Sequence, residues 1–119
     1  MEWKIDKNRP ICPQIEEQLS VKIAGGELKP GEKLSSVREV AVSASVNPNT
    51  VQKAFEGLEA KGLLVSQRGS GWYVADSTEK ATESVEKLAL DKTNEYLDCM
   101  KNLGFDEKQI IKLIKGETL

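Results

Sequence analysis

Two helix-start signals lie close together in the sequence, with room for only about two turns of helix between them. The first is "SVRE", Ser36 to Glu39. This is a capping box, in which the serine hydroxyl caps the glutamate N–H and the glutamate side chain reaches back. The second is Asn47–Pro48, because asparagine is a favoured N-cap residue and proline suits the first helical position. The spacing predicts a short helix that ends near Ser45, a tight turn and a further helix.

The segments on either side of this pair also carry structural signals. After Pro13, apolar residues recur every fourth position over 15–23, which predicts a helix that ends at Gly25–Gly26. Downstream, the β-prone runs "LLVSQ" and "WYVA" flank a Gly-Ser-Gly tip, which predicts a β-hairpin over 64–75. The first residues, "MEWKID", form either a short strand or an extended arm.

Beyond Asp76 the pattern becomes helical again. Apolar residues at helical spacing predict a long helix over about 77–103, which Gly104 stops. A variant capping box, Asp106 to Gln109, then begins a last short helix that ends at Gly116. We therefore expect two helices in this part of the chain.

Three helices followed by a glycine-tipped hairpin are the layout of a winged helix-turn-helix. We expect an α+β fold, with this domain over residues 1–75 and a two-helix segment over 76–119. In such a domain the third helix, here 48–61, lies in the major groove of DNA. The hairpin wing, 64–75, approaches the sugar-phosphate backbone or the minor groove.

Polar residues gather where this architecture meets DNA. Asn, Gln, Thr and Lys are types that hydrogen-bond base edges or phosphates, and glycines at the wing tip let the backbone come close. The candidate DNA contacts are Ser36, Arg38, Asn47, Asn49, Thr50, Gln52, Lys53, Arg68, Gly69, Ser70 and Gly71.

Each of these candidates has a plainer alternative. Asn-Pro-Asn is also a good helix start on any surface, and a glycine tip suits any hairpin. Arg38 is placed either against DNA or in a surface salt bridge with Glu39 or Glu32. Trp72 either touches DNA or packs under the wing, and packing is the favoured placement. Solvated side chains are favoured over phosphate contacts for Lys29 and Lys33.

Several classes of function have little support. The chain has no histidine, and its two cysteines, Cys12 and Cys99, lie far apart, so we expect small buried or half-buried thiols, no metal site, no cofactor and no catalysis. No apolar run suits a membrane span or a signal peptide, so we expect a cytoplasmic protein. The net charge of −2 divides into +1 over residues 1–75 and −3 over 76–119, so the acidic excess lies outside the helix-turn-helix.

The stretch "SSVREVAVSASVNPNTVQKAFEGLEAKGLLVSQRGSGWYV" resembles the DNA-binding domain of GntR-family bacterial transcription regulators, and "VNPNTV" resembles the YtrA subfamily. The resemblance covers roughly residues 9–75. It implies DNA contacts at the positions of Arg38, Thr50 and the wing glycines, and at Gln52 or Lys53. It also implies repression of a nearby transporter operon. Ser35 departs from a proline that many members carry, and Pro48 and Gln52 stand where other subfamilies place arginine, which leaves the operator sequence open.

The two predicted C-terminal helices have more apolar surface than a lone chain of this size would bury. We expect them to pair with a second copy and form a homodimer, as the resemblance also implies. The candidate interface residues are Val85, Leu88, Tyr96, Met100, Leu103, Ile110 and Ile114. The alternative is that these helices fold back on the winged helix. A small-molecule effector is possible, although two helices cannot enclose a pocket by themselves. A winged helix that binds proteins without binding specific DNA is the rival function.

Overall fold

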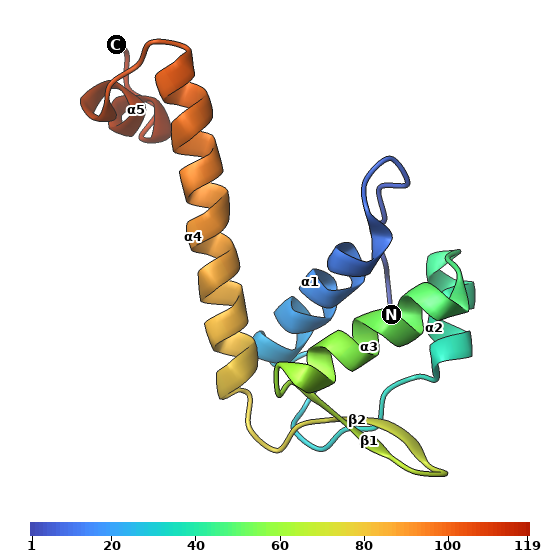
Figure 1. Cartoon of the computed structure of the whole chain (residues 1–119). Helices are drawn as coiled ribbons and strands as arrows, with labels where there is room; N and C mark the ends of the chain where they lie inside the picture. The colour runs from blue at the N-terminus through green and yellow to red at the C-terminus, as the bar shows by residue number, and fades with distance from the viewer. The chain divides into compact units, whose positions relative to one another are not determined.

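The computed structural model describes all 119 residues and contains every helix and strand that the sequence predicts. Five helices and a two-stranded antiparallel hairpin follow one another along the chain (Figure 1). Their bounds are α1 Ile11–Ala24, α2 Val37–Ala44, α3 Pro48–Ala60, β1 Leu64–Gln67, β2 Gly71–Val74, α4 Glu79–Asn102 and α5 Glu107–Ile114.

The helix starts that the sequence marks with capping boxes are confirmed. The Ser36 and Glu39 side chains form the reciprocal capping box of α2, and Asp106 and Gln109 do the same for α5. Helix α2 ends at Ser45, which adopts a left-handed conformation with φ 56°. This residue turns the chain so sharply that α3 can begin three residues later, which produces the tight turn between α2 and α3.

The core of the winged helix lies where α1 and α3 cross and where the hairpin closes over them. The fully buried side chains include Ile15 and Leu19 from α1 and Val51, Phe55 and Leu58 from α3. The "MEWKID" segment is an arm without regular secondary structure, and its Trp3 and Ile5 side chains are partly buried against this core.

The hairpin is anchored at its base on both sides. Leu64 pairs with Val74 and Gln67 with Gly71, so the tip consists of residues 68–70. The Leu34 N–H donates to the Trp72 carbonyl at 2.8 Å, and Lys33 forms an isolated bridge with Tyr73. The Trp72 ring packs edge-on against Phe55, with centroids 5.5 Å apart, so its predicted packing role is confirmed.

The chain divides into two compact units, Met1–Val85 and Glu86–Leu119. The first unit extends past the boundary expected at residue 75, because Ala81 in the first turns of α4 is 1% exposed and belongs to the core. No helix of the chain combines the length and the apolar character that crossing a bilayer requires. Cys12 is half-buried as expected, whereas Cys99 is exposed.

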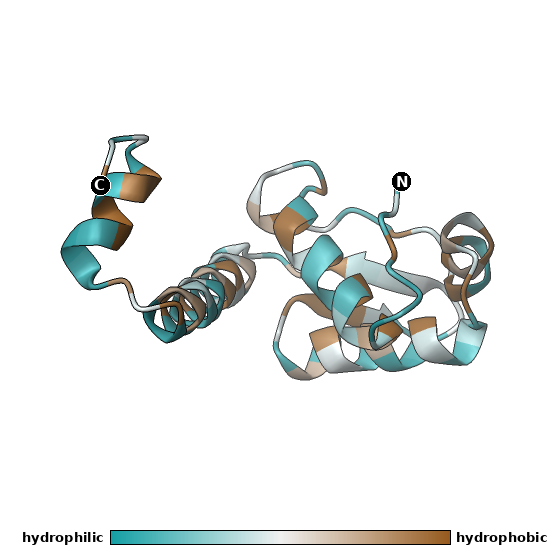
Figure 2. Cartoon of the chain, turned by 90° about the horizontal axis from the view of Figure 1, so that it is seen from above, coloured by the Kyte–Doolittle hydropathy of each residue, from teal (hydrophilic) through white to brown (hydrophobic).

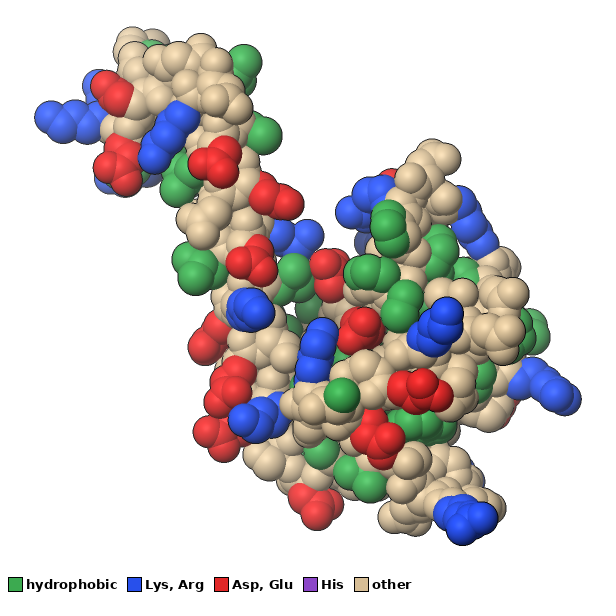
Figure 3. Space-filling model, viewed as in Figure 1, with side chains coloured by type: hydrophobic (Ala, Val, Ile, Leu, Met, Phe, Trp, Pro, Cys, Tyr) green, Lys and Arg blue, Asp and Glu red, His purple; other side chains and the backbone are tan.

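Hydrophilic and hydrophobic residues are interspersed along the second unit (Figure 2), and the face seen in Figure 3 shows both charged and hydrophobic side chains on it. Ile110 is its only fully buried residue, at 1% exposure. Its other hydrophobic side chains are exposed or half-buried, and the largest exposures belong to Leu103, Ile114 and Leu90.

Candidate DNA-binding surface

The start of α3 is built by its own side chains. The Asn47 side-chain oxygen accepts the Asn49 N–H at 2.8 Å, and the Thr50 N–H donates to the Asn47 carbonyl at 3.0 Å. The Asn47 oxygen therefore holds the helix start, while the Asn49 side chain is exposed and Thr50 is half-buried. The positive end of the helix dipole also lies at this point, which favours an anionic partner.

The exposed side of α3 presents Gln52 and Lys53 together with an acidic residue that sequence reasoning did not consider. The Gln52 amide donates to the Glu56 carboxylate at 2.9 Å. This bond fixes the orientation of the glutamine amide. The Glu56 carboxylate also places one negative charge on the exposed side of α3. The sequence itself indicates this contact, because Gln52 and Glu56 are four residues apart and such side chains are neighbours on a helix.

The start of α2 presents Ser36 and Arg38. The Glu39 N–H donates to the Ser36 hydroxyl at 3.1 Å, and the Ser36 N–H donates to the Glu39 carboxylate at 3.2 Å. Hydrogen bonding of its carboxylate with the Ser36 N–H, and with the Ser36 hydroxyl, holds the pKa of Glu39 below its ordinary value. Arg38 is exposed and forms neither of the salt bridges weighed as its alternative, since Glu39 serves the cap and Glu32 accepts the Lys29 N–H.

The wing tip consists of exposed Arg68, Gly69 and Ser70. Gly69 has φ 76°, a conformation that residues with side chains rarely adopt, and nothing lies within 4 Å of the place where a Cβ would stand. The Ser70 hydroxyl hydrogen-bonds the Tyr73 hydroxyl. The tip is therefore open to solvent on the side of Gly69, as a backbone approach to DNA requires.

A carboxylate ties the wing to α3. Glu59 accepts hydrogen bonds from the Ser66 hydroxyl at 2.7 Å and from the Ser66 N–H at 2.9 Å. These two bonds hold the pKa of Glu59 below its ordinary value. The link fixes the first wing strand against the helix that precedes it, and no local sequence pattern indicates it.

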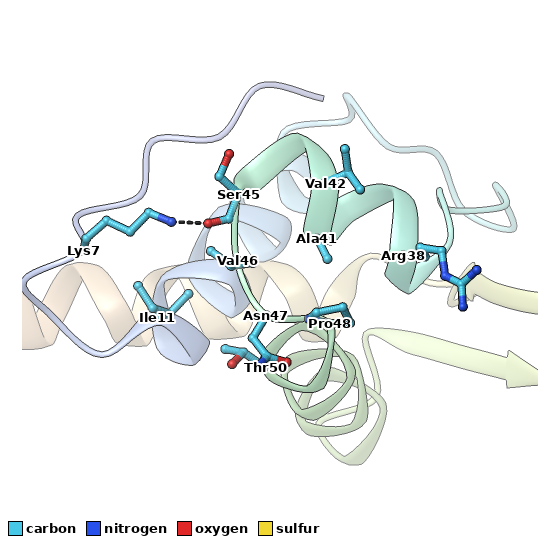
Figure 4. Close-up of a pocket in the computed structure, with 10 residues that line it drawn as sticks. All are labelled: Lys7, Ile11, Arg38, Ala41, Val42, Ser45, Val46, Asn47, Pro48 and Thr50. Carbon is cyan, nitrogen blue, oxygen red and sulfur yellow. Dashed lines mark hydrogen bonds between the residues drawn. The ribbon is translucent and has the colours of Figure 1, made fainter.

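An open hollow lies between the N-terminal arm, α2 and the start of α3 (Figure 4). It brings together three of the predicted contacts, Arg38, Asn47 and Thr50, with an arm residue that was not predicted, Lys7. Its remaining walls are Ile11, Ala41, Val42, Ser45, Val46 and Pro48. Nowhere in the chain do three or more His, Cys, Asp or Glu side chains form a group that could hold a metal ion.

Comparison with known proteins shows which family the chain belongs to. The sequence pattern of the gntR family of bacterial regulatory proteins matches residues 13–74, which contain most of α1, the helix-turn-helix and the wing. The chain belongs to the gntR family. A relative from Bacillus subtilis, the uncharacterized HTH-type transcriptional regulator YhcF, is 34% identical over 118 residues, covering 99% of this chain and 98% of that protein.

A second relative is the HTH-type transcriptional repressor YtrA of B. subtilis, which is 43% identical over 83 residues. That match covers 70% of this chain and 63% of YtrA. Among solved structures, a GntR family transcriptional regulator from Listeria monocytogenes has a TM-score of 0.84 and 31% identity, covering 96% of this chain and all of that one.

One similar structure contains DNA. BusR of S. agalactiae in complex with its busAB-promotor DNA has a TM-score of 0.61 and 26% identity, covering 87% of this chain and 53% of BusR. Together these findings make the chain a YtrA-type GntR regulator, that is, a DNA-binding transcription regulator with a winged helix-turn-helix. The family is one of regulators rather than enzymes.

Proposed function

We propose that this chain is a cytoplasmic, homodimeric repressor that binds a two-fold symmetric operator through α3 and the wing, with no catalytic activity. The observation that carries the proposal is a set of exposed or half-exposed polar side chains, free of intrachain salt bridges, at the start of α2, along the first turns of α3 and at the wing tip. They are Arg38, Asn49, Thr50, Lys53 and Arg68.

These side chains divide by the part of DNA they suit. Asn49, Thr50, Gln52 and Lys53 follow the helix start and have the chemistry to read base edges in the major groove. Arg38 suits a guanine edge or a phosphate, while Arg68 and the glycines around it suit the backbone or the minor groove. Ser36, Asn47 and Ser70 are engaged in intrachain hydrogen bonds, so we assign them positions beside the phosphates.

The exposed apolar side chains of α4 and α5 support a dimer. Tyr96 is 42%, Leu103 71% and Ile114 67% exposed in the single chain. Burial of apolar surface is the main favourable term in protein association, and a second copy supplies a matching surface by symmetry. Val85, Leu88 and Met100 are half-buried already, and Ile110 is buried within its own chain, so in the proposed interface they have less surface left to bury than Tyr96, Leu103 and Ile114.

A dimer would set two copies of α3 about 34 Å apart, one turn of DNA, and would therefore read two half-sites. The repressor assignment rests on the similarity to YtrA of B. subtilis, which is a transcriptional repressor.

The test is selection of duplexes from a random pool by the full chain, followed by gel shift on the selected duplex. Arg38→Ala and Thr50→Ala should each weaken binding by about 1–3 kcal/mol if they read bases. Lys22→Gln, in the last turn of α1, is the matched control and should bind normally. Selection that recovers no common sequence would favour the rival winged helix that binds proteins, and unchanged affinity in both variants would remove these site assignments.

A light-scattering mass measured at micromolar concentration tests the dimer separately. The expected mass is twice the 13.1 kDa of one chain. A single-chain mass would contradict the dimer and leave the assignment of the DNA-binding surface unaffected.

A further inference from the structure

The N-terminal arm is fixed in place by side chains of two different helices. The Trp3 indole N–H donates to the Ser43 hydroxyl of α2 at 3.1 Å. The Gln18 side chain of α1 accepts the Lys4 N–H at 3.0 Å and donates to the Lys4 carbonyl at 2.8 Å. The first residues of a domain are usually poorly ordered unless they are tied down, so this arm is built to occupy one position.

A buried glutamine shapes the loop that follows. Gln14 is 5% exposed, accepts the Asp6 N–H at 2.7 Å and donates to the carbonyls of Asp6 and Pro10 at 2.9 Å. Within the loop, Asp6 accepts the Asn8 N–H and pairs with Arg9 at 3.1 Å. The charge of Arg9 is thereby compensated, whereas Lys7 has no acidic partner.

The loop places Lys7 at the edge of the hollow in Figure 4. Its ammonium donates to the Ser45 carbonyl, at the left-handed end of α2. An ammonium has three donors, so two remain for another acceptor. Arg38 stands on the opposite side of the hollow, and Ile11, Val46 and Pro48 give it an apolar wall.

We propose that the hollow is a phosphate-binding part of the DNA interface, in which Lys7 contacts a backbone phosphate and the adjacent deoxyribose lies against the apolar wall. This inference rests on the proposed function, because it assumes that α3 lies in the major groove. The occupant follows from charge and shape: two cations and the positive end of α3 surround a site with an apolar side, as an anionic sugar-phosphate requires. The arm thus extends the DNA-binding surface beyond the helix-turn-helix.

The test measures duplex affinity against salt concentration, because each neutralised phosphate contributes about −0.9 to the slope of log K against log salt. The probe is the selected duplex, and a ~30-base-pair duplex of mixed sequence serves as a second probe because phosphate contacts are independent of sequence. Lys7→Gln should reduce the slope by about one per bound chain and weaken binding to both probes about three- to tenfold at ~0.1 M salt. Lys7→Arg should restore the slope.

A second variant removes the support of Lys7 without removing its charge. Gln14→Leu releases the loop, so we expect the same loss of slope as in Lys7→Gln, with circular dichroism used to confirm that the chain is folded. Lys22→Gln, which removes one positive charge from the far end of α1, should keep the wild-type slope.

The outcomes distinguish failure of the phosphate contact at Lys7 from failure of the proposed function. If Lys7→Gln lowers the melting temperature but leaves the salt slope unchanged, Lys7 only caps α2 and the inference is overturned. A wild-type chain that binds neither duplex would overturn the proposed function, and this inference with it.

Discussion

At the scale of single residues, the hydrogen bond between Gln52 and Glu56 leads to a prediction about base recognition by α3 in the proposed complex. The carboxylate accepts a hydrogen bond from the glutamine amide, and beside DNA its charge would repel phosphates, so we expect it to reduce non-specific binding more than specific binding. Glu56→Gln should raise affinity for mixed-sequence DNA and reduce the ratio of specific to non-specific affinity about tenfold, the effect of losing about 1.4 kcal/mol of discrimination. Gel shifts with both duplexes measure this ratio. Glu27→Gln, on the turn after α1, is the control, and an unchanged ratio for Glu56→Gln would show that the bond has no part in recognition.

The lowered pKa values of two other carboxylates allow a prediction of how the free energy of unfolding depends on pH. Glu39 and Glu59 accept hydrogen bonds from Ser36 and Ser66, which hold both pKa values below the ordinary 4.5. A lowered folded pKa stabilises the protein fully above pH 4.5, and this stabilisation is lost as the pH falls through the folded values. The double variant Glu39→Gln/Glu59→Gln should therefore lose less stability than wild type between pH 6 and pH 3. Urea midpoints measured across this range test it, with Glu117→Gln as control, and parallel curves would contradict it.

At the scale of elements, local chemistry explains why the helix starts were predictable. A cap involves residues two or three positions apart. The capping roles of Ser36, Asn47 and Asp106 can therefore be predicted from the local sequence. Helix α4 begins at Glu79 rather than at residue 77, because the Ser77 hydroxyl accepts the Glu79 N–H and so acts just before the helix.

Contacts between distant segments were not predictable in the same way. Gln14 appears in the sequence only as a polar residue beside the apolar stripe of α1, and its buried bonds to the arm depend on how the chain folds back. The same holds for the bond between Glu59 and Ser66 and for the placement of Lys7. The sequence therefore predicts the recognition helix and the wing and gives an extended arm as one of two alternatives for the first residues. It predicts neither the contacts that hold this arm nor the link between Glu59 and Ser66.

The start of α3 provides a prediction that separates folding from DNA binding. Asn47→Ala removes the cap and should cost about 1 kcal/mol of unfolding free energy. Asn47→Asp keeps the cap and suits the helix dipole, so its stability should match wild type or exceed it. The added negative charge lies beside the hollow, however, and should weaken duplex binding. Urea unfolding and gel shift on the same two proteins test both halves, and wild-type DNA affinity in Asn47→Asp would place this residue away from the phosphates.

At the scale of the whole molecule, the proposed function assigns DNA binding to the first compact unit and dimerisation to the second. The first unit contains the entire proposed DNA-binding surface, while the second contributes apolar side chains that its own fold does not bury. A single winged helix makes few base contacts, so specific binding of one chain should be weak. Joining two chains makes the second half-site contact intramolecular, which raises overall affinity about 10²- to 10⁴-fold without any new contact to DNA.

This division predicts that variants far from DNA control operator affinity. Leu103→Glu/Ile114→Glu places charges on two highly exposed apolar positions, so we expect the mass in solution to fall to one chain. Affinity for the selected duplex should then fall about 10²- to 10⁴-fold, while the salt slope per bound chain stays the same because the phosphate contacts of each chain are intact. Asn102→Glu adds a charge at the polar position next to Leu103 and should leave the dimer whole. Weaker DNA binding with an unchanged two-chain mass would mean that these residues act on the DNA-binding unit itself, and the proposed interface would have to be abandoned.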